Sequence, residues 1–208
     1  MNPIRKAAIC LVLLSSAAAA YAERGHWRLD PVHTRVLFKV EHAGFSTALG
    51  LFPDIRGELR MDPADWRDAT LEVQVPLAKL QIGDDDWRDK LLSRTWLHAG
   101  KQAEAVFRST RVEPTGEGTA RVHGRLSLRG ESAPVVLDVR LNKHARNPLT
   151  FRETAGFSAT ATLDRRDLGM AEWPNVVGQR VELEIQAEAI RYTPSADEER
   201  RDADPQHD

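Results

Sequence analysis

The stretch "VELEIQAEAI", residues 181–190, decides the fold class of this chain. From Val181 to Ala189, apolar residues at every second position alternate with glutamate and glutamine. Successive side chains of a β-strand point to opposite faces, so this segment has one apolar and one polar face. A strand with one buried and one hydrated face is typical of an antiparallel sheet.

The same period of two recurs along the chain. It is found in residues 36–42, 54–61, 69–77, 122–128, 135–141 and 157–163. Turn residues separate these segments, at Asp30-Pro31, Asp62-Pro63, Gly116 to Gly118 and Arg129-Gly130. About eight strands with little helix to cover a second face must form a sandwich or a closed barrel. The long neighbouring strands favour an up-and-down barrel, and the pattern leaves the sandwich open.

The first 22 residues have the composition of a targeting segment. Arg5 and Lys6 precede a short apolar run, and the segment ends in small residues of the form A-x-A. We expect residues 1–22 to be a secretory signal peptide, because the apolar run is far below the roughly 20 residues needed to span a membrane. The only cysteine of the sequence, Cys10, lies inside this segment. An exported domain without disulfides fits the periplasm, which is the predicted location.

The other end of the chain is polar. From Thr193 onward no apolar residue is larger than alanine, so we expect residues 193–208 to form a disordered tail. Residues 23–192 then form one domain. The net charge of the whole chain is −2, and its basic residues are interleaved with acidic ones. This distribution argues against a nucleic-acid partner.

One segment breaks the alternation. "GDDDWRDKLLSRTWL", residues 83–97, begins with three aspartates and carries its basic residues further along. Acidic residues near a helix N-terminus and basic residues toward its C-terminus favour a helix, which we expect over 84–96. Trp87, Leu91 and Trp96 would share one side of it. Whether this helix is only structural or forms a lid over a ligand site stays open.

Several blocks, in this order, resemble the YceI-like family of exported proteins. They are "WRLDPVHTRVLFKVEHAGFSTALGLF" (27–52), "IRGEL" (55–59), "DDWRDKLLS" (85–93), "AVFRST" (105–110), "GRLSLRGESAPVVLDV" (124–139), "ATATLDRRDLGM" (159–170) and "VELEIQAEAI". The resemblance implies an all-β, eight-stranded antiparallel lipocalin-like barrel with a short helix between the middle strands. It also implies an interior that binds a polyisoprenoid or prenyl quinone chain as cargo. Because a prenyl tail in a bilayer is already out of water, exchange with membranes is feasible, which points to a carrier or store.

The inward faces of the strands, together with a loop before the last strand, supply the candidate ligand-binding residues. The strand residues are Phe38, Val40, His42, Phe52, Leu59, Val73, Leu126 and Phe157, and the loop residue is Trp173. Small inward residues such as Gly124 and Ala159 would leave room for a ligand, although a tapering barrel also needs them for close packing. At the end of its strand, His42 could donate a hydrogen bond to a ligand headgroup or bond only to its own scaffold. Trp173 could cover a barrel mouth or contact a partner.

No motif predicts catalysis or a cofactor. The sequence has no H-E-x-x-H pattern and no G-x-S-x-G elbow, so we assign no catalytic or metal-binding residues and expect the protein not to be an enzyme. The alternatives are a periplasmic module that docks on a protein or membrane without lipid cargo, and a metal-dependent enzyme whose ligands come from distant strands. A transient membrane contact and a homodimer stay open, as do the ligand's chain length and headgroup.

Overall fold

A computed structural model describes residues 24–195 as a β-structure with one short α-helix. The strands are β1 (Gly25–Leu29), β2 (Arg35–His42), β3 (Ser46–Phe52), β4 (Arg56–Asp62), β5 (Asp65–Pro76), β6 (Glu104–Gly116), β7 (Thr119–Leu128), β8 (Glu131–Arg146), β9 (Glu153–Asp164) and β10 (Val177–Tyr192). The helices are α1 (Asp85–Leu92) and two 3-10 turns, η1 (Leu77–Lys79) and η2 (Arg165–Leu168). The predicted signal peptide, residues 1–22, lies outside the described residues, as does the predicted tail beyond residue 195.

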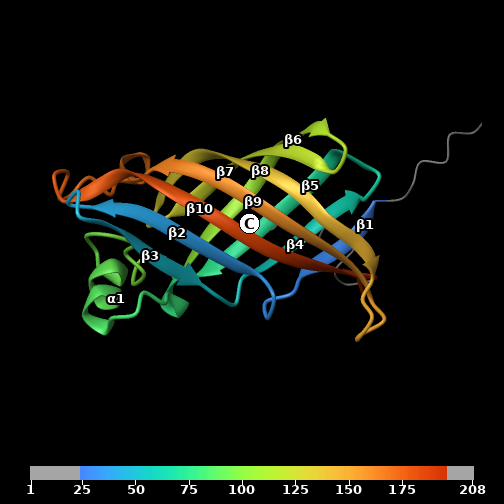
Figure 1. Ribbon diagram of the computed structural model, residues 1–208, viewed down its shortest axis with the longest axis horizontal. Coiled ribbons are helices and arrows are strands. Elements are labelled where there is room, and N and C mark those ends of the chain that lie inside the picture. The colour runs from blue at the N-terminus through green and yellow to red at the C-terminus, as the bar shows by residue number, and fades with distance from the viewer. Residues whose placement is uncertain (1–23, 196–208) are drawn as a thin grey trace, which may run out of the picture.

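The strands form one antiparallel sheet that closes on itself (Figure 1). β1 pairs with both β4 and β10, which closes a ring of eight strands in the order β1-β4-β5-β6-β7-β8-β9-β10. The β2–β3 hairpin extends the sheet from β10. The all-β, eight-stranded antiparallel barrel is therefore confirmed, and the sandwich is excluded because a single sheet supplies every pairing.

Two strand positions in the sheet are each occupied by two shorter strands with a break between them. Residues 30–34 separate β1 from β2, and both halves pair with β10, β2 along Val177–Gln186 and β1 along Ala189–Tyr192. The Asp30 carboxylate stabilises this break by accepting a hydrogen bond from the N–H of Val32 at 2.8 Å. Residues 53–55 separate β3 from β4 in the same way. Beyond the breaks the pairing differs, because β1 lies between β4 and β10 whereas β3 pairs with β2 alone among the described strands.

The segment between β5 and β6 covers the outer edge of β3. Within residues 24–195, β3 has only β2 as a strand partner, and its other edge makes an isolated bridge between Leu51 and Gln81. The N–H of each of these two residues donates to the carbonyl of the other, at 2.8 and 2.9 Å. η1 precedes Gln81 and α1 follows it, and α1 lies beside β3 in Figure 1. The segment that carries the helix is therefore held against the edge of β3.

The helix is shorter than the sequence predicts. Asp84 caps its N-terminus by accepting the N–H of Trp87 at 2.8 Å, and Ser93 ends it well before the predicted end at residue 96. After Ser93 the chain turns, with the N–H of His98 donating to the Ser93 carbonyl and His98 at φ +50°. Trp87 is 40% exposed, so it does not share the buried side that Leu91 and Trp96 form. No helix within residues 24–195 is long and apolar enough to cross a membrane.

Candidate functional site

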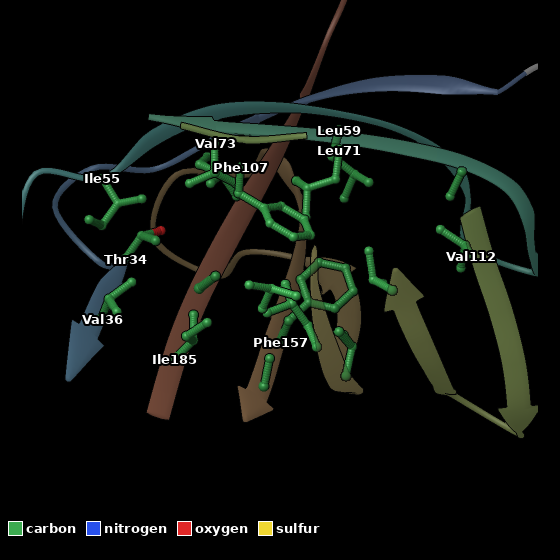
Figure 2. A pocket seen from close by; sticks show the side chains of 18 of the residues that line it. Thr34, Val36, Ile55, Leu59, Leu71, Val73, Phe107, Val112, Phe157 and Ile185 are labelled. Carbon is green, nitrogen blue, oxygen red and sulfur yellow. The ribbon is translucent and has the colours of Figure 1, made fainter. Parts of the chain in front are cut away.

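The inward faces of the strands enclose two apolar cavities. Cavity A has a volume of about 170 Å³ and is drawn in Figure 2. Aliphatic and aromatic side chains from β2, β4, β5, β6, β7, β8, β9 and β10 line it, including Leu59, Val73 and Phe157. Its polar side chains are two threonines and the indole of Trp66, whose N–H donates to the Pro63 carbonyl at 3.2 Å. The surface offered to a ligand is therefore apolar.

Cavity B lies toward the end of the barrel that carries α1. Its volume is also about 170 Å³, and its walls come from β2, β3, β5, β6, β7, β9 and β10. Leu91 of α1 and Trp96 of the following turn close one side, while Leu168 of η2 and Met170 close another. The α1 segment is thus part of the wall of this cavity, so a movement of α1 would change access to it.

Four aliphatic side chains line both cavities. They are Val36, Val75, Leu126 and Leu183, from β2, β5, β7 and β10. The two cavities therefore adjoin one another at these four side chains. Each of them is only partly buried, unlike the fully packed core residues next to them. We call this group the partition.

Arg165 is the one charged side chain that lines either cavity in the described part of the chain. It is 2% exposed, and it donates hydrogen bonds to the carbonyls of Gly178 at 2.9 Å, Val177 at 2.8 Å and Met170. Its guanidinium lies 5.2 Å from the centre of the Trp96 ring. Burial lowers its pKa. These contacts tie η2 to the start of β10 and close the end of cavity B.

The sequence reasoning missed Arg165. The residue lies in the block "ATATLDRRDLGM", but alternation ends with β9 at Asp164 and therefore cannot tell which of two adjacent arginines points inward. The structure places Arg166 outward, where it pairs with the Asp164 carboxylate and holds the pKa of that group at about 2. The αL conformation of Gly169, φ +72°, ends the turn.

The predicted site residues divide between the two cavities. Leu59, Val73 and Phe157 line cavity A, Phe38, Val40 and Phe52 line cavity B, and Leu126 lines both. The predicted residues thus line two adjoining cavities that meet at the partition. Whether any of these residues contacts a ligand stays a prediction.

His42 and Trp173 line neither cavity. The His42 ring lies 5.5 Å from the ring of Trp87, centre to centre, so this strand end packs against α1 and not against the barrel interior. Trp173 is 61% exposed and stands at φ +56° in the turn before β10. The hypothesis that His42 lies among the inward aromatic and aliphatic residues is therefore wrong in its geometry.

The expectation that Gly124 leaves room for a ligand is also wrong. A Cβ atom at Gly124 would lie 2.3 Å from the Phe107 ring and 2.5 Å from the Arg108 carbonyl oxygen. The space beside this glycine is filled by the neighbouring strand and by an aromatic ring. Ala159, by contrast, does line cavity A. The small residue at position 124 thus allows close packing of neighbouring strands, whereas the small residue at position 159 lines a cavity.

A cluster of ionisable groups lies at the break between β1 and β2. His33 Nδ1 is 2.7 Å from a carboxylate oxygen of Asp30 and 3.9 Å from one of Glu188. Hydrogen bonding to Asp30 and the two nearby negative charges raise the pKa of His33. Burial raises the pKa of Asp30, but hydrogen bonds from His33 and the Val32 N–H outweigh it, and the net shift is downward.

This cluster is the one group within residues 24–195 whose ligating atoms could surround a metal ion. None of its three residues lines cavity A or B. It holds the interrupted strand against β10, together with the backbone hydrogen bond from Asp30 N–H to the Glu188 carbonyl at 2.8 Å. The hydrogen bond between His33 and Asp30 thus lies within the turn that separates β1 from β2.

The fold and the site define a closed antiparallel β-barrel with an apolar, hollow interior. Residues 27–189 match the family model described as the YceI-like domain. The chain is 33% identical over 186 residues to a UPF0312 protein of Pseudomonas putida strain W619, covering 88% of this chain and 94% of the relative. A UPF0312 protein of Ectopseudomonas mendocina is 30% identical over 190 residues, with 90% and 99% covered. The chain belongs to the YceI-like family.

Solved structures show the same fold. BcnA of Burkholderia cenocepacia superimposes with a TM-score of 0.69 at 20% identity, over 77% of this chain and 98% of that one. A polyisoprenoid-binding domain from Saccharophagus degradans, described as implicated in plant cell wall breakdown, gives a TM-score of 0.63 at 11% identity, over 82% and 100%. At these identities the likeness concerns the fold alone.

Proposed function

We propose that this protein binds the chain of a polyisoprenoid-type lipid, such as a prenyl lipid or prenyl quinone, inside its barrel. The observation that carries the proposal is the pair of apolar cavities, A and B, that share the partition along the barrel interior. Two apolar spaces in line suit a long unbranched ligand better than a compact one. The similar domain that is described as polyisoprenoid-binding supports this ligand class.

The energetics favour a carrier or a store over a tight receptor. Each methylene group removed from water contributes about 0.8 kcal/mol, but a prenyl tail in a bilayer is already out of water. Transfer from membrane to barrel therefore gains little from the hydrophobic effect, and the net preference comes from shape and from the headgroup. When the lipid prefers the barrel over the membrane by only a small free energy, it can move from the membrane into the protein and back again. We propose that this exchange takes place in the periplasm, after export directed by residues 1–22.

The cavity volumes set a condition on the ligand. An apolar cavity of about 150 Å³ holds a benzene molecule, so each cavity accommodates roughly one five-carbon isoprene unit as it stands. A longer chain has to extend from one cavity into the other past Val36, Val75, Leu126 and Leu183, and we propose that these side chains rotate to admit it. We propose that chain binding and this rotation occur together.

Two measurements test the proposal. Protein purified from cells is extracted with organic solvent, and mass spectrometry of the extract should identify an isoprenoid lipid near one per protein. An extract with only ordinary phospholipid counts against the proposal. Binding of prenyl alcohols of increasing length should then strengthen from one isoprene unit to several, because a longer chain occupies both cavities.

A catalytic role has less support. The cluster of Asp30, His33 and Glu188 lies outside both cavities, so a metal held there would not face a ligand in the barrel. We therefore propose a binding protein without enzymatic activity. Near-stoichiometric zinc, copper or iron in the purified protein, lost on replacing His33 with glutamine, would support the metal-dependent alternative.

A further inference from the structure

The β8–β9 hairpin presents two large apolar side chains to solvent at its tip. Leu149 is 87% exposed and Phe151 is 71% exposed, two residues apart in the turn of residues 147–152. Single exposed apolar residues are ordinary on protein surfaces. Here two of them share one protruding turn at the end of the barrel opposite α1, as Figure 1 shows for the loop between β8 and β9.

The tip is a defined structure. The side-chain oxygen of Asn147 accepts the N–H of Leu149 at 2.9 Å and that of Thr150 at 3.2 Å. The N–H of Phe151 donates to the Asn147 carbonyl at 2.8 Å, and Phe151 stands at φ +56°. A bulky residue in the left-handed region is held there only by surrounding structure. The hydrogen bonds of Asn147 therefore fix the turn that holds both apolar residues in solvent.

Basic residues flank these apolar side chains. Lys143 and Arg146 precede the turn on β8, and Arg152 follows it; all three are exposed. None of the three forms an ion pair with a carboxylate of residues 24–195, whereas the neighbouring Glu153 is already bound by His144 at 2.8 Å and by Arg191 at 3.1 Å. The acidic group that remains nearby is Glu188. The hairpin end thus carries a net positive charge on a chain whose overall charge is −2.

A polar groove lies at the base of the hairpin. It has a volume of about 150 Å³ and is lined by Lys143, Arg146, Asn147 and Glu188, together with Ala145, Pro148, Thr154 and Gly156. Two cations and an amide beside an apolar tip match a phospholipid, because the phosphate is anionic and the acyl chains begin directly below it.

The opposite end of the barrel provides a contrast. Phe45, in the turn between β2 and β3, is 93% exposed, but its turn is held by the Glu41 carboxylate, which accepts the N–H of Gly44. Asp84, Asp85 and Asp86 lie nearby at the start of α1, where Trp87 contacts His42. The negative charges of these aspartates would be repelled by an anionic membrane surface, so the exposed ring of Phe45 is not placed to dock on one.

We propose that the tip of the β8–β9 hairpin docks on an anionic phospholipid bilayer. Leu149 and Phe151 enter the boundary between headgroups and acyl chains, and Lys143, Arg146 and Arg152 contact the phosphates. Electrostatic attraction brings the protein to the membrane and the short apolar insertion keeps it there, a combination that gives reversible binding. This docking goes beyond the lipid cargo and would operate whether or not the barrel holds an isoprenoid.

Vesicle flotation tests the proposal with the purified protein. Vesicles of phosphatidylglycerol and phosphatidylethanolamine should bind it, and phosphatidylcholine vesicles should bind it at least about tenfold more weakly. Arg146→Gln and Arg152→Gln should each weaken binding roughly fivefold, the factor that corresponds to about 1 kcal/mol for each basic residue at an anionic surface. The double variant Leu149→Ser and Phe151→Ser should weaken it at least about tenfold.

The matched control is Phe45→Ser, which removes a still more exposed ring from the acidic end and should leave vesicle binding unchanged. All these side chains are exposed, so melting temperatures should stay at the wild-type value and confirm folding. A probe attached at Thr150→Cys, in a Cys10→Ser background, should report an apolar environment on vesicles, whereas one at Ser46→Cys should not. The proposal is overturned if the wild-type protein does not bind anionic vesicles or if the hairpin variants bind them as tightly as the wild type. It is also overturned if Phe45→Ser weakens binding as much as the hairpin variants do.

Discussion

Replacing Leu126 with phenylalanine is expected to close the passage between cavities A and B. Leu126 lies on β7 and, with Val36, Val75 and Leu183, forms the partition that lines both cavities. The other three positions already hold branched aliphatic side chains, so a larger ring enters the shared wall and prevents the rotation that a long chain requires. A bound chain would then be confined to one cavity.

The cavity volumes give the size of this effect. Losing access to a cavity of about 170 Å³ removes the space for roughly one isoprene unit. Five carbon atoms at about 0.8 kcal/mol each amount to at most about 4 kcal/mol relative to water. Much of this upper bound is offset because the excluded segment can stay in a membrane, so we expect a roughly tenfold loss of loading, which corresponds to about 1.4 kcal/mol. The folding cost should lie near the low end of about 1–3 kcal/mol for overpacking, since empty space adjoins the site on both sides.

The assay measures the amount of isoprenoid extracted per protein by mass spectrometry. A thermal melt of the same protein measures its stability. We expect Leu126→Phe to lower the melting temperature by only about 2–4 °C, as about 1 kcal/mol does in a domain of this size. The matched control is Val136→Phe, because Val136 lies on the neighbouring β8 and is 39% exposed on the outer face. Wild-type loading by a folded Leu126→Phe protein would mean that the chain does not pass the partition.

Three further results are expected. A Cβ atom at Gly50 would lie 2.2 Å from the Phe38 ring, so Gly50→Ala should destabilise the fold by about 1–3 kcal/mol in thermal unfolding. Because the three nearest atoms all belong to that ring, a second change of Phe38→Leu should recover most of the loss; no recovery would place the strain in the backbone. Arg165→Met leaves three carbonyls without a donor and should cost about 3 kcal/mol or more, whereas the exposed Arg166→Met should cost less than about 1 kcal/mol. The pKa of His33 is raised, so its ion pair with Asp30 stabilises the fold fully below the ordinary histidine pKa of about 6.5, and this contribution is lost as pH rises through the folded-state pKa. Melting curves of His33→Gln and wild type should therefore differ at about pH 5.5 and converge at about pH 9, and a constant difference would show that the histidine acts through packing.

Sequence reasoning succeeded where the signal is local. The alternation in "VELEIQAEAI" predicts which face of β10 is inward, and Leu183 and Ile185 do line cavity A. The Asp30-Pro31 turn is likewise predicted correctly, because an aspartate side chain bonds to the N–H two residues ahead whatever the rest of the fold does. The predicted helix has the right place but is too long, since its end depends on the packing of the following turn against the barrel.

The reasoning failed where side chains from distant strands meet. His42 continues the inward alternation of β2, yet its ring contacts Trp87 on α1, because the strand end extends past the barrel interior. The absence of a side chain at Gly124 predicts free space, although the Phe107 ring from the paired strand occupies that position. Neither outcome is encoded in the spacing of residues along one strand.

By itself, the sequence determines an antiparallel β-structure with an apolar side on each strand, because the pleat of a strand alternates side chains irrespective of their neighbours. The tertiary structure decides that β1 meets β10, that β1 and β2 act as one interrupted strand, and that the interior holds two cavities that adjoin at four side chains. The physical reason is that a cavity is the difference between the space a closed ring encloses and the volume of the side chains that fill it. That difference depends on the register and tilt of all eight strands together.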